Sequence, residues 1–288
     1  MEGRVVAAHG RQYVVELPDG SLLPCFTRGK KSDVACGDRV DIQRTSDDQG
    51  VIEAIQPRTS LLYRSNEIRQ KLIAANVDQV VIVVATEPGF SDELVTRALL
   101  AAESEEIEPL IVLNKCDLTE RVAAARAQLA VFANLGYRVL ELSALDHAED
   151  LRPELQGYTS VLVGQSGMGK STLVNALVPE ARAATREISS ALDSGKHTTT
   201  HATLYHLDAE SALIDSPGLQ EFGLGHLDRQ EIEYAFREFR PYVGQCRFRD
   251  CHHDREPDCA LTAAVATGKI DQRRFAVYHR IMGTQRTD

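Results

Sequence analysis

One eight-residue segment has the pattern of a phosphate-binding loop. Residues 164–171 read Gly-Gln-Ser-Gly-Met-Gly-Lys-Ser, which fits G-x-x-x-x-G-K-[ST]. The glycines let the backbone curl until successive N–H groups point at phosphate oxygens, and the amino end of a following helix adds partial positive charge. We expect Lys170 to reach the β- and γ-phosphates and Ser171 to bind Mg²⁺. The expected phosphate-contacting residues are Gly164, Gln165, Ser166, Gly167, Met168, Gly169, Lys170, Ser171 and Thr172.

A second segment has the residues that distinguish guanine from adenine. Asn114-Lys115-Cys116-Asp117 follows the apolar run 109–113. Guanine presents a ring N–H beside an amino group, and the Asp117 carboxylate can accept from both, whereas adenine has no such donor pair. We expect Lys115 to cover one face of the base and Asn114 to tie this loop to the phosphate loop. Alone, the tetrapeptide fits an ordinary polar turn, but beside a phosphate loop it favours a guanine site.

A shorter base-contacting motif follows another apolar run. Ser143 and Ala144 end the run 139–142. The backbone N–H of Ala144 is expected to donate to the guanine carbonyl oxygen.

Residues for Mg²⁺ and the γ-phosphate lie downstream of the phosphate loop. Asp215 follows the apolar run 212–214 and is expected to hold Mg²⁺ through water, while Gly218 contacts the γ-phosphate. A threonine from the run 197–201, either Thr199 or Thr200, is expected to complete the Mg²⁺ coordination. These motifs together predict a GTP-hydrolysing enzyme that uses GTP/GDP with Mg²⁺.

The residue that would orient the attacking water differs from the common GTPase pattern. Leu219 follows Gly218, where many GTPases have Gln. We therefore expect slow hydrolysis by the isolated protein. His226 is our candidate for positioning the water, and a packing histidine is the competing interpretation.

The order of the motifs is rotated. GTPases ordinarily read phosphate loop, switch threonine, DxxG, NKxD and then SA. Here the motifs at 114 and 143 precede the loop at 164. Circular permutation explains this order, because it moves only the chain break. The segment after Gly218 then leads directly into the C-terminal region, so hydrolysis can move that region.

A cluster near the C-terminus has the spacing of a structural zinc site. Three cysteines and a histidine are spaced C-x4-C-x-H-x5-C, and thiolates with imidazole suit tetrahedral Zn²⁺. Four protein ligands leave no open coordination position, so one Zn²⁺ should stabilise the fold. His252 is an alternative to the histidine ligand, and free buried cysteines are the competing interpretation. The expected ligands are Cys246, Cys251, His253 and Cys259.

The elements that must position these residues fall into three groups. Five short strands at 3–8, 12–17, 22–26, 38–43 and 51–55 predict a small barrel, an OB-fold or an SH3-like barrel. Alternating apolar strands and helices then predict a doubly wound α/β domain. A helix at 230–239 and a last helix at 260–281 flank the zinc cluster. The expected domains are 1–66 with a linker, 67–227, and a helical zinc-binding domain at 228–288.

Composition sets limits on the partners. The 288 residues carry a net charge of −10, which argues against binding nucleic acid by bulk attraction. No run approaches the ~18 apolar residues of a membrane span, so we expect a cytoplasmic protein without membrane contact. Local basic clusters lie at Arg28, Lys30 and Lys31 and at Arg273, Arg274 and Arg280, and solvated surface charge is the competing interpretation of each cluster.

Taken together, the motifs resemble a known family over nearly the whole chain. The rotated order, the 164–172 loop, the runs 196–200, 215–218 and 221–224, and the cysteine–histidine spacing are similar to the small-ribosomal-subunit biogenesis GTPases of bacteria, the RsgA or YjeQ family. The resemblance implies an N-terminal OB-fold, a circularly permuted G domain and a C-terminal zinc domain. It also implies a monomer that binds the 30S subunit and its 16S rRNA late in maturation, with 30S-stimulated hydrolysis and release afterwards. Contact with rRNA would come from the loop at 28–31, the linker arginines and the C-terminal helix.

Two other functions remain open. A GTP-gated binding module, in which hydrolysis is incidental, gains weight from Leu219. A P-loop ATPase or kinase is opposed by Asp117, whose carboxylate would repel the acceptor of adenine. Competition between GTP and ATP distinguishes an ATPase or kinase from a GTP-binding protein. Stimulation of hydrolysis by a partner distinguishes a ribosome-stimulated GTPase from a GTP-gated binding module.

Overall fold

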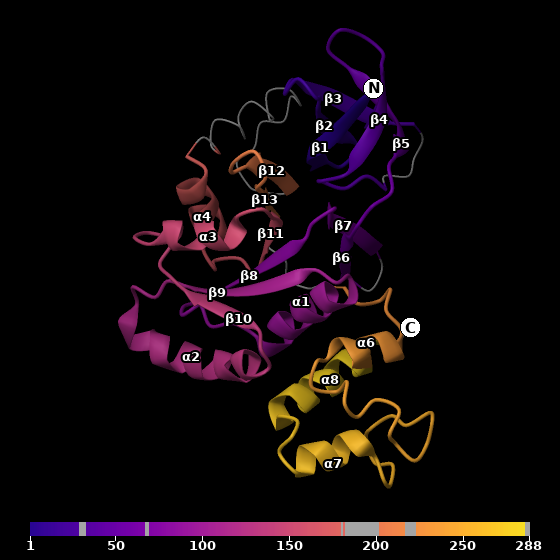
Figure 1. Cartoon of the computed structure of the whole chain (residues 1–288), viewed down its shortest axis with the longest axis vertical. Coiled ribbons are helices and arrows are strands. Elements are labelled where there is room, and N and C mark those ends of the chain that lie inside the picture. The colour runs from indigo at the N-terminus through magenta and orange to yellow at the C-terminus, as the bar shows by residue number, and fades with distance from the viewer. Residues whose placement is uncertain (29–32, 67–68, 180, 182–201, 217–222, 286–288) are drawn as a thin grey trace.

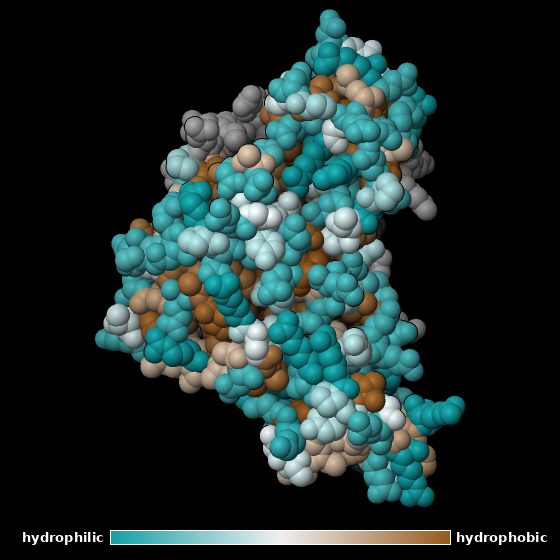
Figure 2. Space-filling model, viewed as in Figure 1, coloured by the Kyte–Doolittle hydropathy of each residue, from teal (hydrophilic) through white to brown (hydrophobic). Residues whose placement is uncertain are grey.

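The computed structural model describes the chain except for residues 29–32, 67–68, 180, 182–201, 217–222 and 286–288. The N-terminal barrel, a central sheet with helices on both faces, and a C-terminal helical unit follow one another along the long axis of the molecule (Figure 1). The face in Figure 2 is mostly hydrophilic, with apolar side chains gathered over the central part. None of the described helices is long and apolar enough to cross a bilayer.

The barrel forms from the five predicted strands. They are β1 (Glu2–His9), β2 (Gln12–Glu16), β3 (Leu22–Thr27), β4 (Arg39–Arg44) and β5 (Gly50–Ile55). Their order is β1-β2-β3-β5-β4, and an additional β1–β4 pairing closes the barrel, with β3 parallel to β5. Apolar side chains that alternate along these strands, including Val5, Val15 and Val40, fill its core. The closed five-stranded barrel is OB-like, which confirms this part of the predicted fold.

The expected linker contains a hairpin that the sequence prediction missed. Strands β6 (Leu61–Asn66) and β7 (Arg69–Ala75) pair as a separate two-stranded sheet. Leu62 and Ile73 are buried in the central core, although charged residues at 64, 69 and 71 make this stretch resemble a linker. The expected boundary after residue 66 would divide this hairpin, and we propose a boundary before Leu61 instead.

The central domain is a mainly parallel sheet, as predicted. The order is β10-β9-β8-β11-β13-β12, and only β12 runs antiparallel to its neighbour β13. The residues of β8 are all buried, as expected for a β-branched strand covered on both faces. The strands are β8 (Gln79–Ala85), β9 (Glu108–Asn114), β10 (Arg138–Glu141), β11 (Thr159–Val163), β12 (Ala202–His206) and β13 (Ala212–Asp215).

Helices cover both faces of this sheet (Figure 1). One face carries α1 (Asp92–Ser104) and α2 (Thr119–Asn134), and the other carries α3 (Arg152–Leu155) and α4 (Lys170–Leu177). A 3₁₀ turn, η1 (Ala148–Leu151), precedes α3 and was not predicted. The alternation of strand and helix therefore confirms the doubly wound class.

The C-terminal unit contains one more helix than predicted. Its described helices are α6 (Arg229–Ala235), α7 (Ala260–Ala266) and α8 (Gln272–Gln285). The single helix expected at 260–281 is interrupted, because Gly268 adopts φ 69° and the Asp271 carboxylate accepts the N–H groups of Arg273 and Arg274. The helix expected at 230–239 also ends early, at Ala235.

The barrel and the central sheet are continuous. Strand β1 pairs antiparallel with β12, where Ala7 lies opposite Thr203 and Ala8 opposite Ala202. The edge of the central sheet is therefore covered by the barrel, and the two domains share one eleven-stranded sheet.

Candidate functional site

The phosphate loop connects β11 to the amino end of α4, as the motif requires. Lys170 is the first residue of α4 and is buried. Its ammonium donates to the carbonyl oxygens of Gly164 (2.7 Å) and Gln165 (3.0 Å), so the cation lies inside the loop. Burial lowers the pKa of Lys170, and the nearby Asp215 carboxylate opposes that shift. Ser171, on the first turn of α4, is exposed.

Asp215 lies at the carboxyl end of β13, beside the phosphate loop strand. Its register partner in the parallel neighbour β11 is Leu162, two residues before Gly164. The carboxylate is buried, which raises the pKa of Asp215 to about 6, while Lys170 acts in the opposite direction. The next residue, Ser216, donates its hydroxyl to the Leu162 carbonyl oxygen at 2.6 Å and fixes the start of this loop. Lys170 and Asp215 thus influence each other electrostatically at the place where a metal–phosphate complex would bind.

Asn114 joins three loops that lie far apart in the sequence. Its side-chain nitrogen donates to the Met168 carbonyl oxygen at 2.8 Å, and its side-chain oxygen accepts the N–H groups of Lys115 (2.8 Å) and Ala144 (2.9 Å). The amide is buried, with 1% of its surface exposed. The tie between base loop and phosphate loop expected from the sequence is therefore present. The Ala144 N–H expected to reach guanine is engaged with Asn114, so its contact with the base stays a prediction.

The remaining base-loop residues are arranged around this amide. Lys115 adopts a positive φ of 62°, and its ammonium donates to the Glu87 carbonyl oxygen at 2.8 Å. Asp117 is exposed, so its carboxylate is accessible. Cys116 packs against the core, and burial raises the pKa of its thiol. Ser143 is buried, and its carbonyl oxygen accepts the N–H of His147.

Sequence reasoning missed two residues that support the base loop. The Thr86 hydroxyl donates to the Lys115 carbonyl oxygen at 2.9 Å, and the Glu87 carbonyl holds the Lys115 ammonium. Both residues follow β8, whose neighbours in the sheet are β9 and β11. The available signal was their position, because loops at the carboxyl ends of adjacent parallel strands converge on a ligand site.

Several predicted residues lie outside the described part of the chain. These are the threonine candidates and the glycine expected at the γ-phosphate: Thr199, Thr200 and Gly218.

His226, the candidate for positioning the water, lies shortly before α6 in the chain. Its ring packs against Tyr63 of the β6–β7 hairpin, with centroids 4.6 Å apart. Burial lowers the pKa of His226, and the carboxylates of Glu105 and Glu231 oppose that shift. Glu105 is the C-cap of α1. The role of His226 in positioning the water stays a prediction.

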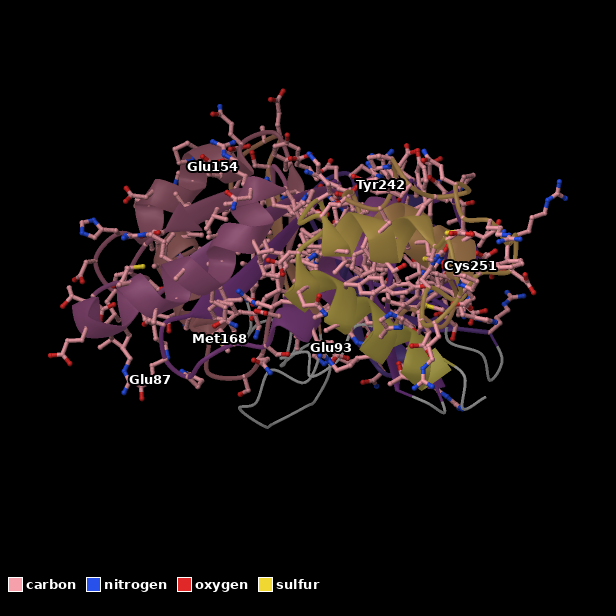
Figure 3. All side chains as sticks on the ribbon, turned by 90° about the horizontal axis from the view of Figure 1, so that it is seen from below. Glu87, Glu93, Glu154, Met168, Tyr242 and Cys251 are labelled. Atoms are coloured by element: carbon pink, nitrogen blue, oxygen red, sulfur yellow. The ribbon has the colours of Figure 1, made fainter. Side chains whose placement is uncertain are left out.

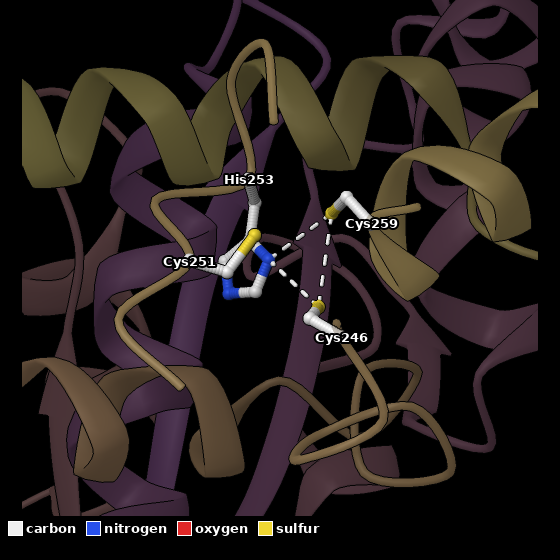
Figure 4. A group of neighbouring side chains, drawn as sticks. All are labelled: Cys246, Cys251, His253 and Cys259. Carbon is white, nitrogen blue, oxygen red and sulfur yellow. Dashed lines mark hydrogen bonds between the residues drawn. The ribbon is translucent and has the colours of Figure 1, made fainter. Parts of the chain in front are cut away.

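The cysteine–histidine cluster has the dimensions of a tetrahedral zinc site (Figure 4). The four ligand atoms lie within 4.8 Å of one another. The Cys246 and Cys259 sulfurs are 3.8 Å apart, and His253 Nδ1 lies 3.5 Å and 3.3 Å from them. Tetrahedral Zn²⁺ with ordinary bond lengths requires sulfur–sulfur and nitrogen–sulfur separations of about 3.8 and 3.5 Å. His252, the alternative ligand, is exposed.

The environment of Cys259 favours a thiolate. Burial opposes its ionisation, but hydrogen bonds from Thr262 and His253 outweigh that effect and lower the pKa of Cys259 to about 7. This cluster is remote from the nucleotide motifs. Figure 3 places Cys251 at one end of the molecule and Met168 of the phosphate loop toward the other.

Comparison with known proteins identifies relatives over nearly the full length. Residues 55–225, more than half of the chain, match the family model described as RsgA GTPase. The chain is 56% identical to the small ribosomal subunit biogenesis GTPase RsgA of Burkholderia pseudomallei (strain K96243) over 286 residues, covering 98% of this chain and 91% of that protein.

Two solved structures share the fold. The crystal structure of YjeQ from Thermotoga maritima has a TM-score of 0.73 at 30% identity and covers 99% of this chain and 98% of that one. The crystal structure of YloQ, described as a circularly permuted GTPase, has a TM-score of 0.70 at 30% identity, with coverage of 99% and 95%. These likenesses cover the barrel, the central domain and the C-terminal unit together.

Proposed function

The chain belongs to the RsgA GTPase family, and from this premise we propose that it hydrolyses GTP during late maturation of the small ribosomal subunit. The contact between Asn114 and the Met168 carbonyl supports this proposal most directly, because it joins the guanine-reading loop to the phosphate loop despite their rotated order. The Asp117 carboxylate then selects guanine over adenine.

Hydrolysis requires the phosphates to be positioned and their charge neutralised. Lys170 binds the β- and γ-phosphates, and the N–H groups at the start of α4 point toward them. Ser171, Asp215 through water, and Thr199 or Thr200 would hold Mg²⁺, which neutralises charge on the phosphate oxygens. Gly218 contacts the γ-phosphate. The ligand chemistry fits, because hydroxyl and carboxylate oxygens are preferred by Mg²⁺.

Placement of the attacking water is the step that needs a partner. Leu219 has no polar group, and the ring of His226 packs on Tyr63. We propose that His226 positions the water only after the segment that carries it is rearranged by the 30S subunit. His226→Ala would then reduce stimulated turnover strongly while leaving the slow basal rate and nucleotide binding unchanged. Equal stimulation of wild type and variant would contradict this role.

Contact with 16S rRNA must come from few cations. The C-terminal arginines that we expected to contribute are engaged within the chain: Arg273 with Asp92, Arg274 with Glu238 and Arg280 with Glu93. Arg274 is buried and is therefore not retained as an rRNA contact, whereas Arg273 and Arg280, with 47% and 55% of their side chains exposed, remain proposed contacts. Arg28 extends from the barrel with 67% of its side chain exposed, although it pairs with Glu53. We propose that the barrel loop at 28–31, most of which lies outside the described residues, contacts rRNA together with the linker arginines and the exposed arginines of the C-terminal helix, and that the protein acts as a monomer in the cytoplasm.

The cysteine–histidine cluster is proposed to hold one structural Zn²⁺. The separations of its ligand atoms support this assignment. The metal would crosslink residues 246–259 and stabilise the C-terminal unit.

The decisive experiment measures GTP turnover by the purified protein with and without 30S subunits, with ATP as the control nucleotide. We expect slow, GTP-selective turnover that rises strongly with 30S subunits. Turnover indifferent to 30S subunits would leave a GTP-gated binding module, the alternative favoured by Leu219. Equal turnover of ATP would overturn the guanine assignment.

A further inference from the structure

A buried carboxylate lies beside the proposed zinc site. Glu233 projects from α6 and has 7% of its surface exposed. Its Oε1 atom lies 3.2 Å from His253 Nε2, accepts the Tyr278 hydroxyl at 2.8 Å and is 3.8 Å from Arg229 Nη1. A buried charge is costly unless it is paired and hydrogen-bonded. These contacts satisfy the carboxylate, and one of them is made to a proposed metal ligand.

The two nitrogens of His253 face different partners. Nδ1 points toward the Cys246 and Cys259 sulfurs, at 3.5 and 3.3 Å, whereas Nε2 points toward Glu233 (Figure 4 shows the sulfur side). A neutral imidazole that binds metal through one nitrogen carries its proton on the other. Metal coordination through Nδ1 therefore requires a proton on Nε2, and the Glu233 carboxylate is placed to accept it.

We propose that Glu233 is an outer carboxylate of the zinc centre, which fixes the orientation and tautomer of His253 and, with Tyr278, couples the metal to helix α6. This inference rests on the proposed Zn²⁺ site and adds a positioning residue to it. Carboxylates that accept from a metal-bound histidine raise its basicity, and their loss costs about 10- to 100-fold in metal affinity.

The coupling matters because of where α6 lies in the chain. It is the first described helix after the γ-phosphate motif, and its N-cap is Asp228, whose carboxylate forms a capping box with that of Glu231. Tyr278 belongs to α8 and packs edge-on against Phe236 and Phe239. Glu233 thus connects the metal ligand, the helix that follows the nucleotide switch, and α8.

A second buried carboxylate provides a matched control. Glu238 has 8% of its surface exposed, follows α6, and pairs with Arg274 at 2.7 Å. Its described contacts are with Arg274 and not with the cysteine–histidine cluster. Glu238→Gln removes a buried charge from the same unit without touching His253, so it separates general destabilisation from an effect on the metal.

The test measures Zn²⁺ affinity of the full chain by competition with a chromophoric chelator. We expect Glu233→Gln to bind Zn²⁺ about 10- to 100-fold more weakly than wild type, Tyr278→Phe to show a smaller loss, and Glu238→Gln to retain wild-type affinity. If wild type binds no Zn²⁺, the zinc proposal itself fails. If wild type binds Zn²⁺ and Glu233→Gln binds it equally well, or loses no more than Glu238→Gln, only the role of Glu233 is overturned.

Amide hydrogen exchange supplies a second readout, the change in α6 exchange when Zn²⁺ is removed, which a purely structural role of Glu233 would leave intact. In wild type, removing Zn²⁺ should accelerate exchange in α6. In Glu233→Gln, α6 should already exchange faster with Zn²⁺ bound and respond little to its removal. Should Glu233→Gln fail to fold, Tyr278→Phe decides, because unchanged Zn²⁺ affinity and an unchanged α6 response in that variant would overturn the inference.

Discussion

The barrel and the C-terminal unit are attached to the central domain by different kinds of contact. The barrel is joined through main-chain atoms: β1 pairs with β12, and the Ala75 N–H donates to the Cys36 carbonyl at 2.9 Å. The C-terminal unit is joined through side chains: apolar residues such as Phe236 belong to the same core cluster as α1, and Arg237 and Arg240 share Glu103 of that helix. Hydrogen bonds between main-chain atoms persist when most side chains are replaced, whereas a contact between side chains is lost when either residue is replaced. Single substitutions should therefore loosen the C-terminal unit more readily than the barrel.

The largest effect should come from removing a proposed zinc ligand. Cys251→Ala should lose the bound Zn²⁺ and most of the hydrogen-exchange protection of α7 and α8, while the barrel keeps its protection, because metal binding and folding of such a segment are coupled. Cys25→Ala, which removes a buried thiol from the barrel, is the control and should retain Zn²⁺. A Cys251→Ala protein with wild-type Zn²⁺ content would contradict both the site and the comparison.

The next effect should come from the buried ion pair. Arg274 has 1% of its surface exposed, pairs with Glu238, donates to the Thr96 hydroxyl at 2.6 Å, and lies over the ring of Phe236. Arg274→Ala leaves an unpaired buried charge and should lower the free energy of unfolding of the C-terminal unit by about 3–5 kcal/mol.

Denaturant titration followed by exchange in α8 measures this loss. Combining Arg274→Met with Glu238→Leu should recover most of it, because the charge is then removed with its partner. A single variant within about 1 kcal/mol of wild type would show that this attachment does not depend on the pair.

A smaller effect is expected at the main-chain attachment of the barrel. Gly37 has φ 94°, and a Cβ there would collide with the Ala75 carbonyl oxygen, so Gly37→Ala should destabilise the barrel by about 1–3 kcal/mol. Gly20→Ala is the matched control, because Gly20 also has a positive φ (80°) but no atom within 4 Å of an added Cβ. Thermal unfolding of both variants should show the greater loss for Gly37→Ala. Equal losses would mean that the close approach adds nothing to the cost of the backbone conformation.

The smallest effect belongs to an exposed ion pair of the C-terminal unit. Arg280 pairs with Glu93 at 3.2 Å, with 55% of its side chain exposed. Arg280→Ala should change the free energy of unfolding by about 0–1 kcal/mol, and less at high salt. A loss of unfolding free energy as large as that of Arg274→Ala, or one that is unchanged in 1 M salt, would contradict this prediction. It would show that the solvent exposure of an ion pair does not determine how much the pair stabilises the C-terminal unit.

Local patterns predicted the elements and the site motifs, but not the contacts between them. The apolar run at 80–85 and the glycine-rich loop at 164 are each defined by neighbouring residues, so their structures follow from local rules. Arg274 belongs to a basic cluster in the sequence, but it is buried against Glu238 and Thr96, which lie 36 and 178 residues away. The sequence predicts a linker at 61–75, where the structure has a hairpin. Its buried residues, including Leu62 and Ile73, pack in the central core against residues that are distant in the sequence. Likewise, only the packed structure places Glu233 beside His253.

The shared edge of β1 and β12 also constrains the order in which the protein is made. β1 finds β2 and β4 within the first part of the chain, so the barrel can close while synthesis continues. Its pairing with Ala202 and Thr203 must wait until most of the chain has emerged, because β12 follows the phosphate loop. Contacts of such long sequence separation form slowly. The nascent barrel therefore presents an open strand edge to its surroundings. Pairing of β12 with this edge is a late step in the synthesis and folding of the protein.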